Sequence, residues 1–288
     1  GGGSVLDCAK GINILYMRGG ELAQYAGPVL NGSALLPMVG APTTAGTGSE
    51  VSPFLLISDS QTHAKIVVKD WQAVPCAAVL DPSLTVSLPA KPTLYAGLDA
   101  LVHGFESYVA KGTQPYTQAL ALKAMELVYQ NLPKVMDQPS DVEARGNMLL
   151  ASNMAGMAFA LSYLGLSHSL ANALTKFGGT PHGLAVGMML PQVIRFNSKA
   201  VGQAYAYIAR HLLGPDCSPK PEEASMALAA SIEDWARSLG MPRKLDEIGF
   251  QAGQIPDLVE ETLRQATVQF NPLQPTAGEL RSLLEPYF

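Results

Sequence analysis

The sequence has few charged residues and only three cysteines, and both scarcities disfavour whole classes of protein. Charged residues make up 15% of the 288 residues and the formal net charge is −5, so no basic surface for nucleic acid is expected. The three cysteines lie far apart, without a C-x-x-C pair. An odd number of separated cysteines argues against a disulfide framework and fits a reducing cytoplasm. The composition therefore favours small-molecule chemistry.

The sequence does not open with segments that resemble a signal peptide, nor with methionine. One uncharged stretch, residues 148–166, has the length of a bilayer span, but it contains Ser152, Asn153 and Gly156 and has no flanking aromatic or basic clusters. We interpret it as a buried helix with small residues at its contacts, and expect no membrane partner. Because no strand precedes the opening glycines, we expect that part of the natural N-terminus is missing.

With 48% hydrophobic residues, the chain is long enough for two domains. A helix is predicted over residues 4–17, where Ser4 and Asp7 resemble a capping box and Val5, Ala9, Ile12 and Tyr16 form an apolar stripe. Short apolar runs between turn-forming residues predict strands at 35–39, 54–57, 66–68 and 77–80.

After Pro92 the apolar residues recur with helical spacing. The predicted helices are 92–110, 115–131, 141–163, 167–177, 182–195, 199–213, 222–238 and 255–268. A boundary near Pro89 therefore divides an α/β domain, residues 1–89, from an all-α domain, residues 90–288. Clefts between such domains are common ligand sites.

The stretch GLDALVHGFE, residues 97–106, combines two stripes on one predicted helix. Leu98, Leu101, Val102 and Phe105 have the spacing of a core-facing stripe, and Asp99, His103 and Glu106 form the polar stripe beside it. A carboxylate and an imidazole one turn apart can pair with each other or point together at a third body, such as a metal ion.

A second stretch, LGLSHSLANALTKFGGTPHG at residues 164–183, places His168 and His182 in helical segments of the same domain. Together with Asp99 and His103 they would supply three imidazole nitrogens and one carboxylate oxygen, a set that suits Fe(II) or Zn(II). The spacing alone is also compatible with another interpretation, in which each is an ordinary histidine in a helix that forms a hydrogen bond with a neighbouring residue.

Two glycine-containing stretches have the features of anion-binding turns. In PTTAGTGSEVS, residues 42–52, glycines allow backbone amides to approach a nucleotide phosphate and hydroxyl groups add donors, although a polar surface loop has the same composition. GGGS before a helix offers amides and a helix dipole, but it is also a common artificial linker. Neither stretch matches a P-loop.

Taken in order, GGGSVLDCAK, PTTAGTGSEV, the VLDP strand end, GLDALVHGFE and GLSHSLANAL-TKFGGTPHG resemble the iron-containing, group III alcohol dehydrogenase family over essentially the whole chain. The resemblance implies a dehydroquinate-synthase-like fold, with a partial N-terminal Rossmann-like nucleotide-binding domain and a C-terminal helical metal-binding domain. It implies that Asp99, His103, His168 and His182 are catalytic and bind Fe(2+) or Zn(2+).

The same resemblance implies a site for NAD or NADP. Near the pyrophosphate and ribose it would place Gly2, Gly3, Ser4 and Asp7. On the nicotinamide and phosphate side it would place Thr43, Thr44, Thr47, Ser49, Ser52 and Lys65. On the adenosine side it would place Leu84 and Val86. Without the resemblance, Lys65 is a solvated charge at a strand end.

The implied activity is reversible hydride transfer between a small primary alcohol and nicotinamide, catalysed by a cytoplasmic homodimer. Mostly small, apolar residues near the proposed site, without an arginine to clamp a carboxylate, favour such a substrate. The alternatives are a zinc polyol dehydrogenase resembling glycerol dehydrogenase and a catalytically silent metal-binding fragment. The sequence departs from the family at Asn172, where many members have a proton-relaying histidine, and at Leu273, where an arginine is usual.

Overall fold

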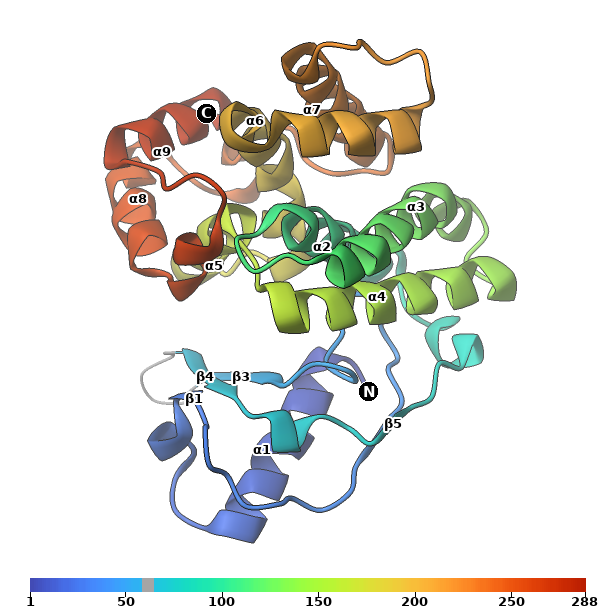
Figure 1. Ribbon diagram of the computed structural model, residues 1–288, viewed down its shortest axis with the longest axis vertical. Coiled ribbons are helices and arrows are strands. Elements are labelled where there is room, and N and C mark those ends of the chain that lie inside the picture. The colour runs from blue at the N-terminus through green and yellow to red at the C-terminus, as the bar shows by residue number, and fades with distance from the viewer. Residues whose placement is uncertain (59–64) are drawn as a thin grey trace.

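The computed structural model describes residues 1–58 and 65–288, which form two parts with separate hydrophobic cores. Figure 1 shows the N-terminal part, coloured blue, below the helices of the C-terminal part. Ile14, Leu55, Val68 and Ala73 form the small core of the first part. The core of the second part is much larger and runs from helix α2 to the C-terminus. The expected combination of α/β and all-α structure is confirmed.

The N-terminal part consists of one long helix, α1 (Gly3–Arg18), and two small sheets. The first sheet has the order β1-β4-β3, in which β1 is parallel and β3 antiparallel to β4. The second is a parallel pair of β2 and β5. The strands span Gly27–Pro28 (β1), Val39–Gly40 (β2), Phe54–Ser58 (β3), Lys65–Lys69 (β4) and Ala77–Ala78 (β5), and short 3-10 helices lie at Leu22–Tyr25 (η1), Trp71–Ala73 (η2) and Pro82–Thr85 (η3).

The C-terminal part is helical throughout its described residues. Its α-helices are α2 (Ala90–Val109), α3 (Pro115–Asp137), α4 (Val142–Ser162), α5 (Leu166–Gly178), α6 (His182–Leu213), α7 (Pro221–Ser238), α8 (Ile255–Arg264) and α9 (Ala277–Leu284). Four 3-10 helices accompany them: η4 (Asp246–Ile248), η5 (Ala252–Gln254), η6 (Ala266–Phe270) and η7 (Glu285–Tyr287).

Helix α2 lies at the centre of the C-terminal part, because α3, α4 and α6 all pack against it. Leu98, Leu101 and Phe105 are buried, as the apolar stripe predicted. The polar stripe is buried as well, since Asp99 and His103 are 5% and 4% exposed. A buried carboxylate requires compensation by bound charge or hydrogen bonds, and this requirement shapes the site described below.

The predicted capping box of the first helix is wrong. Helix α1 begins at Gly3 with Gly2 as its N-cap, and no side chain caps it, so Ser4 lies inside the helix. Asp7 instead accepts hydrogen bonds from Ser49 Oγ at 2.6 Å and from the Leu56 N–H at 2.9 Å. The Asp7 carboxylate is therefore bound to residues far away in the sequence and not to the N-terminus of its own helix.

The predicted buried stripe of the same helix is also wrong. Val5, Ile12 and Tyr16 are exposed, because the small core lies on the other side of α1, where strand β3 packs. The face of α1 that is buried carries a different set, Leu6, Lys10, Gly11 and Ile14.

Several other helices and strands have boundaries that differ from the predicted ones. The strand expected at 35–39 is reduced to Val39–Gly40 because Pro37 lacks the N–H that a strand ladder needs, and the one expected at 77–80 is reduced to Ala77–Ala78. The two helices expected at 182–195 and 199–213 are one helix, α6, with non-helical backbone at Val201. Helix α8 ends at Arg264, before the expected 268. Helix α9 was not predicted, although Thr276 and Glu279 form its capping box.

The loop of residues 42–52 lies directly on helix α4. A Cβ built at Gly48 would lie 2.5 Å from Gly156 Cα, and one built at Gly156 would lie 2.8 Å from Gly48 Cα. Gly48 has a φ of +60°, a backbone conformation that favours glycine. One turn earlier on α4, Asn153 Nδ2 donates to Glu50 Oε1 at 3.1 Å. Small residues on α4 therefore permit close contact between the loop and the helical part.

Lys10 holds the C-terminal end of this loop, where the chain enters strand β3. Its side chain is fully buried, and Nζ donates to the carbonyl oxygens of Ser52 and Phe54, each at 2.9 Å. Burial lowers the pKa of Lys10 to about 8, although the carboxylates of Asp7 and Glu50 act in the opposite direction. The ammonium thus fixes two backbone carbonyls at an electrostatic cost to the folded state.

No single helix in residues 1–58 and 65–288 has both the length and the apolarity to cross a membrane. Helices α4 and α5 meet the test only as a pair, by length and composition, and they are bent by 102° relative to each other. Cys8, Cys76 and Cys217 are free.

The close crossing of Gly48 and Gly156 predicts that Gly156→Ala destabilises the protein, by about 1–3 kcal/mol. The added methyl group would meet the backbone of Gly48, which has no side chain to move aside. Gly146→Ala is the matched control on the same helix, because its Cβ would lie 3.7 Å from the nearest atom, Pro82 Cγ. We expect that control to be neutral or to stabilise by up to about 1 kcal/mol. Urea unfolding of both variants measures the difference, and equal losses would contradict the close contact.

The buried Lys10 predicts a specific dependence of stability on pH. Between the folded pKa of about 8 and the unfolded value of 10.5, the unfolded chain binds more protons, so the free energy of unfolding rises with pH. Relative to Lys10→Met, which does not titrate, wild-type stability should increase by roughly 2 kcal/mol from about pH 7 to pH 10. Chemical denaturation across this range provides the measurement. Parallel curves for the two proteins would show that Lys10 titrates normally.

Candidate metal centre

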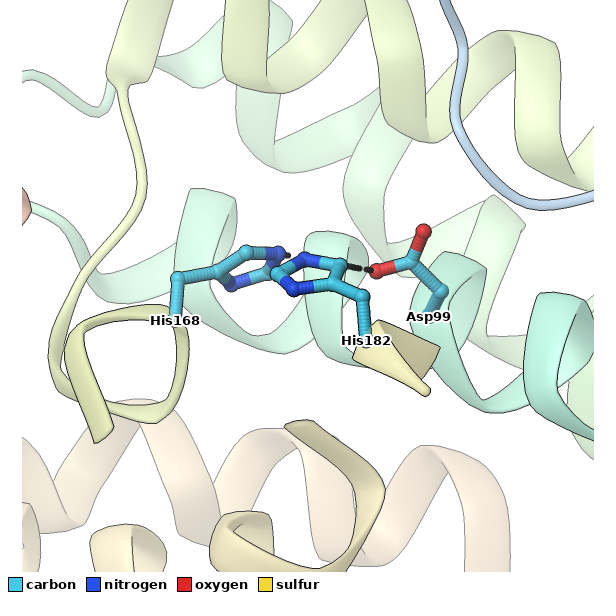
Figure 2. Close-up of side chains that lie close together, drawn as sticks. All are labelled: Asp99, His168 and His182. Carbon is cyan, nitrogen blue, oxygen red and sulfur yellow. Dashed lines mark ion pairs between the residues drawn. The ribbon is translucent and has the colours of Figure 1, made fainter. Parts of the chain in front are cut away.

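Three helices bring one carboxylate and three imidazoles together. Asp99 and His103 come from α2, His168 from the first turn of α5, and His182 from the first residue of α6. Asp99 Oδ1 lies 3.5 Å from His103 Nε2, 3.6 Å from His168 Nε2 and 3.8 Å from His182 Nε2. Figure 2 shows the side chains of Asp99, His168 and His182 pointing toward one another. We call these four residues the Asp–His cluster.

The cluster has the dimensions of a metal site. One ligand atom each from Asp99, His168 and His182 can be chosen so that all lie within 4.8 Å of one another. Two ligands that lie each about 2.0–2.2 Å from a shared ion can be at most about 4.4 Å apart, so a small adjustment would bring the widest pair into range. His103 Nε2, which lies 3.5 Å from the same carboxylate oxygen, adds a third nitrogen and a fourth ligand atom.

Two ligand atoms of the cluster, Asp99 Oδ1 and His168 Nε2, are buried without a hydrogen-bond partner among residues 1–58 and 65–288. Buried polar atoms are rarely left unsatisfied, because losing water without replacement costs about 1–3 kcal/mol each. A cation held between them would satisfy both. His182, whose side chain is 40% exposed, lies at the more open side of the cluster.

The charges of the cluster also suit a cation. Burial raises the pKa of Asp99, but the surrounding imidazoles outweigh burial and hold it well below its usual range. Burial lowers the pKa of His103 to about 4, so this imidazole is neutral. Burial opposes charge on His168 too, yet Glu106 and Asp99 raise its pKa to about 9. Metal binding to His168 would therefore release a proton near neutral pH.

The loop of residues 42–52 reaches the cluster through His103. His103 Nδ1 lies 3.1 Å from the carbonyl oxygen of Gly46, which can only accept a hydrogen bond. The proton is therefore on Nδ1, and Nε2 is left as the atom that faces Asp99. The ring of Phe159, on α4, covers the imidazole at 4.5 Å between centroids. A single backbone carbonyl thus connects the loop to the Asp–His cluster.

The opening glycines and the threonines of the loop lie against each other. A Cβ at Gly2 would lie 3.2 Å from Thr44 Cγ2, and one at Gly3 would lie 2.6 Å from Thr47 Cγ2. The Thr43 N–H donates to the Gly1 carbonyl at 3.0 Å. The structure therefore joins the two stretches that were expected to hold a dinucleotide, and their glycines are required by this close contact.

The remaining residues of the expected nucleotide site are distributed around these stretches. Ser49 and Ser52 are buried, and Ser49 Oγ is bound to Asp7. Leu84 is exposed on η3, and Val86 follows it, half-buried. Lys65 begins β4, but its side chain lies outside the described residues. Their contact with a cofactor stays a prediction.

Glu106 and Asn271 lie close to the cluster, although neither was predicted to have a role in it. Glu106 Oε2 is 2.7 Å from His168 Nδ1, and Asn271 Oδ1 accepts a hydrogen bond from the Leu166 N–H at 3.2 Å. Glu106 shares the polar stripe with Asp99 and His103, which was the available signal. Its partner, His168, follows 62 residues later in the sequence, and helical spacing cannot predict a contact between residues so far apart.

The two departures from the family pattern have ordinary structural partners. Asn172 Nδ2 donates to Gln265 Oε1 at 3.0 Å, so this amide is held by a neighbouring side chain. Leu273 contributes its carbonyl to Asn271 Nδ2 at 2.7 Å and packs against the main core. Leu273 is thus accommodated by the core and by this hydrogen bond.

Comparison with known proteins agrees with this architecture. The family model described as "Fe-containing alcohol dehydrogenase family, C-terminal" matches residues 93–288, and "Iron-containing alcohol dehydrogenase" matches residues 1–82. A 1,3-propanediol dehydrogenase of Klebsiella pneumoniae is 35% identical over 289 residues, covering 100% of this chain and 74% of that protein. An NAD-dependent methanol dehydrogenase of Bacillus methanolicus is 35% identical, covering 99% and 75%.

Solved structures show the same relationship. The crystal structure of a 1,3-propanediol oxidoreductase superposes on this chain with a TM-score of 0.96. The two are 33% identical in sequence, and the match covers 100% of this chain and 75% of the other. A sulfoacetaldehyde reductase from Bifidobacterium kashiwanohense, in complex with NAD+, has a TM-score of 0.88 at 32% identity, covering 99% and 74%. The chain thus spans about three quarters of these relatives and has their fold. Two matching family models and this shared fold establish that the chain belongs to the iron-containing alcohol dehydrogenase family.

Proposed function

We propose that this chain is a metal-dependent, NAD(P)-linked alcohol dehydrogenase of class EC 1.1.1.-, which transfers hydride reversibly between a small primary alcohol and nicotinamide. The observation that carries the proposal is the convergence of three imidazole Nε2 atoms on Asp99 Oδ1, at 3.5–3.8 Å, beside the glycine-containing loop. Membership of the iron-containing alcohol dehydrogenase family supports a role for the cluster in alcohol oxidation.

Asp99, His103, His168 and His182 would hold Fe(2+) or Zn(2+). One carboxylate oxygen and three neutral nitrogens form a ligand set that both ions accept, and the partnerless buried atoms Asp99 Oδ1 and His168 Nε2 support it. When bound, the ion supplies Lewis acidity toward an alcohol oxygen, and the nicotinamide supplies the hydride acceptor.

The chain's own residues fix the direction and exposure of the ligands. Asp99 places a buried negative charge at the centre, and the Gly46 carbonyl orients the His103 ring. Phe159 covers that ring and excludes water from its face. Asn172 offers no titrating group and is occupied by Gln265, so the proton must leave through water or a ribose hydroxyl of the cofactor.

We place NAD or NADP across the surface where the opening glycines meet the loop of residues 42–52. The contacts of Gly2 with Thr44 and of Gly3 with Thr47 support this placement, because a dinucleotide pyrophosphate needs backbone amides without intervening side chains. The two chemically distinct halves of such a cofactor would then extend toward the Asp–His cluster and toward Leu84 and Val86 on and after η3.

The division of the chain at Pro89 into residues 1–89 and 90–288 is part of the proposal. The two separate hydrophobic clusters support it, and helix α2 begins at Ala90. A cytoplasmic location is supported by the three free cysteines, and a homodimer by the family resemblance alone.

Metal loading provides the direct test. Removing the metal with a chelator should lower the rate of nicotinamide reduction by short primary alcohols by about 100-fold or more, and Fe(2+) or Zn(2+) should restore it, since Lewis-acid stabilisation is worth several kcal/mol. Asp99→Asn should reduce bound metal and activity together. Asp257→Asn, which changes an exposed carboxylate on α8, is the matched control and should change neither.

Three outcomes distinguish the candidates. Unchanged rates after complete chelation would refute the role of the metal. Faster turnover of glycerol than of simple alcohols, with zinc bound, would identify a polyol dehydrogenase. Bound metal without nicotinamide reduction by any short alcohol would identify a silent metal-binding protein.

A further inference from the structure

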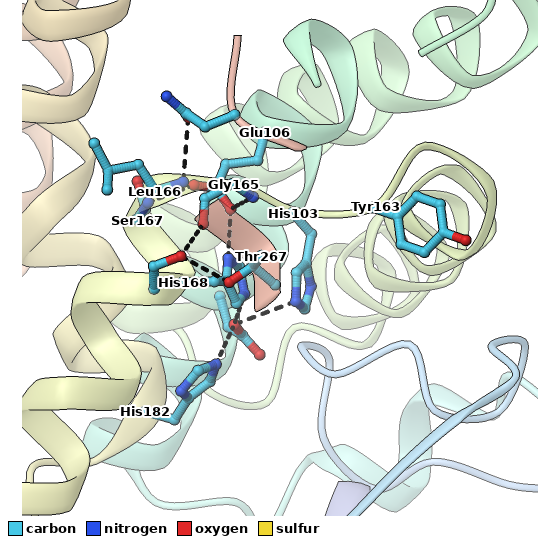
Figure 3. A network of polar contacts seen from close by, with 12 residues as sticks. His103, Glu106, Tyr163, Gly165, Leu166, Ser167, His168, His182 and Thr267 are labelled. Atoms are coloured by element: carbon cyan, nitrogen blue, oxygen red, sulfur yellow. Dashed lines mark hydrogen bonds and ion pairs between the residues drawn. The ribbon is translucent and has the colours of Figure 1, made fainter. Parts of the chain in front are cut away.

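The start of helix α5 is held by residues from elsewhere in the chain. Its N-cap, Gly165, has no side chain, yet the N–H groups of Gly165, Leu166 and Ser167 all have side-chain acceptors. The Gly165 N–H donates to Glu106 Oε2 at 2.8 Å, and the Ser167 N–H donates to Glu106 Oε1 at 2.5 Å. Asn271 Oδ1 accepts from the N–H of Leu166 between them. Figure 3 shows this network around the beginning of α5.

His168 lies in the first turn of that helix and contacts the same carboxylate. Its Nδ1 is 2.7 Å from Glu106 Oε2, a distance typical of a charge-assisted hydrogen bond. An ionised carboxylate only accepts, so Nδ1 carries a proton. Nε2 then faces Asp99 Oδ1, at 3.6 Å, with no hydrogen-bond partner of its own.

Glu106 therefore combines two roles in one buried side chain, since it accepts two backbone N–H groups at the start of α5 and contacts His168 Nδ1. It lies seven residues after Asp99 on the same stripe of α2 and is 4% exposed, so water does not compete for its oxygens. Each carboxylate oxygen accepts a backbone N–H of α5, which fixes the carboxyl plane relative to the helix. The hydrogen bond to this carboxylate fixes the orientation of the imidazole ring and keeps a proton on Nδ1.

We propose that Glu106 is a positioning residue that keeps a proton on His168 Nδ1 and directs Nε2 at the Asp99 carboxylate, and thereby sets the metal affinity of the Asp–His cluster. This inference rests on the proposed function, because it requires that the cluster binds a metal ion. Glu106 acts through His168 and does not itself need to touch the ion or the substrate.

Glu106→Gln tests the proposal with little change in side-chain size. The amide keeps one acceptor but presents N–H groups where the α5 backbone or His168 also donates, so at least one of the observed hydrogen bonds is lost. We expect the dissociation constant for Zn(2+), measured by competition with a chelator of known affinity, to rise about 10- to 100-fold.

Asn271→Ala is the matched control, because Asn271 caps the same helix end through Leu166 without contacting His168. This variant should unfold at lower temperature, yet its Zn(2+) dissociation constant should remain within about threefold of wild type, well below the loss expected for an orienting partner. Equal weakening of metal binding by both variants would assign the effect to helix capping and overturn the positioning role.

The wild-type arm of a spectroscopic readout does not depend on the variant folding. In metal-free wild-type protein, long-range proton–nitrogen NMR of the histidine rings should show His168 with a proton on Nδ1 that is protected from exchange. In Glu106→Gln that protection should be lost. A wild-type His168 protonated only at Nε2 would refute the proposal.

The outcomes also separate this inference from the function on which it rests. If wild type binds no Zn(2+), Co(2+) or Fe(2+), the proposed function fails and Glu106 sets no affinity. If wild type binds metal and Glu106→Gln binds it within twofold as well, the metal centre stands and only the positioning role fails.

Discussion

The structure depends on one constraint, which is that the Asp99 carboxylate is buried in the middle of a helical core. An isolated buried charge would be prohibitively costly, so the surrounding helices must supply compensating groups at fixed positions. They do so with three imidazoles, from α2, α5 and α6, whose Nε2 atoms converge on one oxygen. The packing of α2 against its neighbours and the chemistry of the cluster are therefore parts of the same arrangement.

The N-terminal part meets this arrangement through its loop and through its first sheet, where Lys69 Nζ on β4 donates to the Tyr163 hydroxyl at 2.6 Å. Backbone contacts dominate: the Gly46 carbonyl binds His103, and Gly48 lies on Gly156. Below the loop, Lys10 holds the carbonyls of Ser52 and Phe54. Threonine hydroxyls of the same loop remain near the opening glycines, so one segment is fixed on its helical side and carries its polar groups on the other.

Local spacing in the sequence was sufficient to predict most helices and the pairing of Asp99 with His103, because one helical turn sets both. It could not predict partners whose separation is set by tertiary packing, such as Glu106 with His168 or Asn271 with the start of α5. Helix α1 shows the opposite failure: its apolar stripe, which includes Ile12, is exposed, because periodicity identifies a face but not what packs on it.

The contact of Gly48 with Gly156 leaves no clearance between a loop and a helix that belong to different parts of the chain. Side chains usually absorb small backbone shifts, but here none is present to do so. Mutational libraries that aim to widen the range of accepted alcohols should therefore leave both glycines unchanged and vary the surrounding side chains. A backbone shift at the contact of Gly48 with Gly156 would be transmitted through the Gly46 carbonyl to the His103 imidazole.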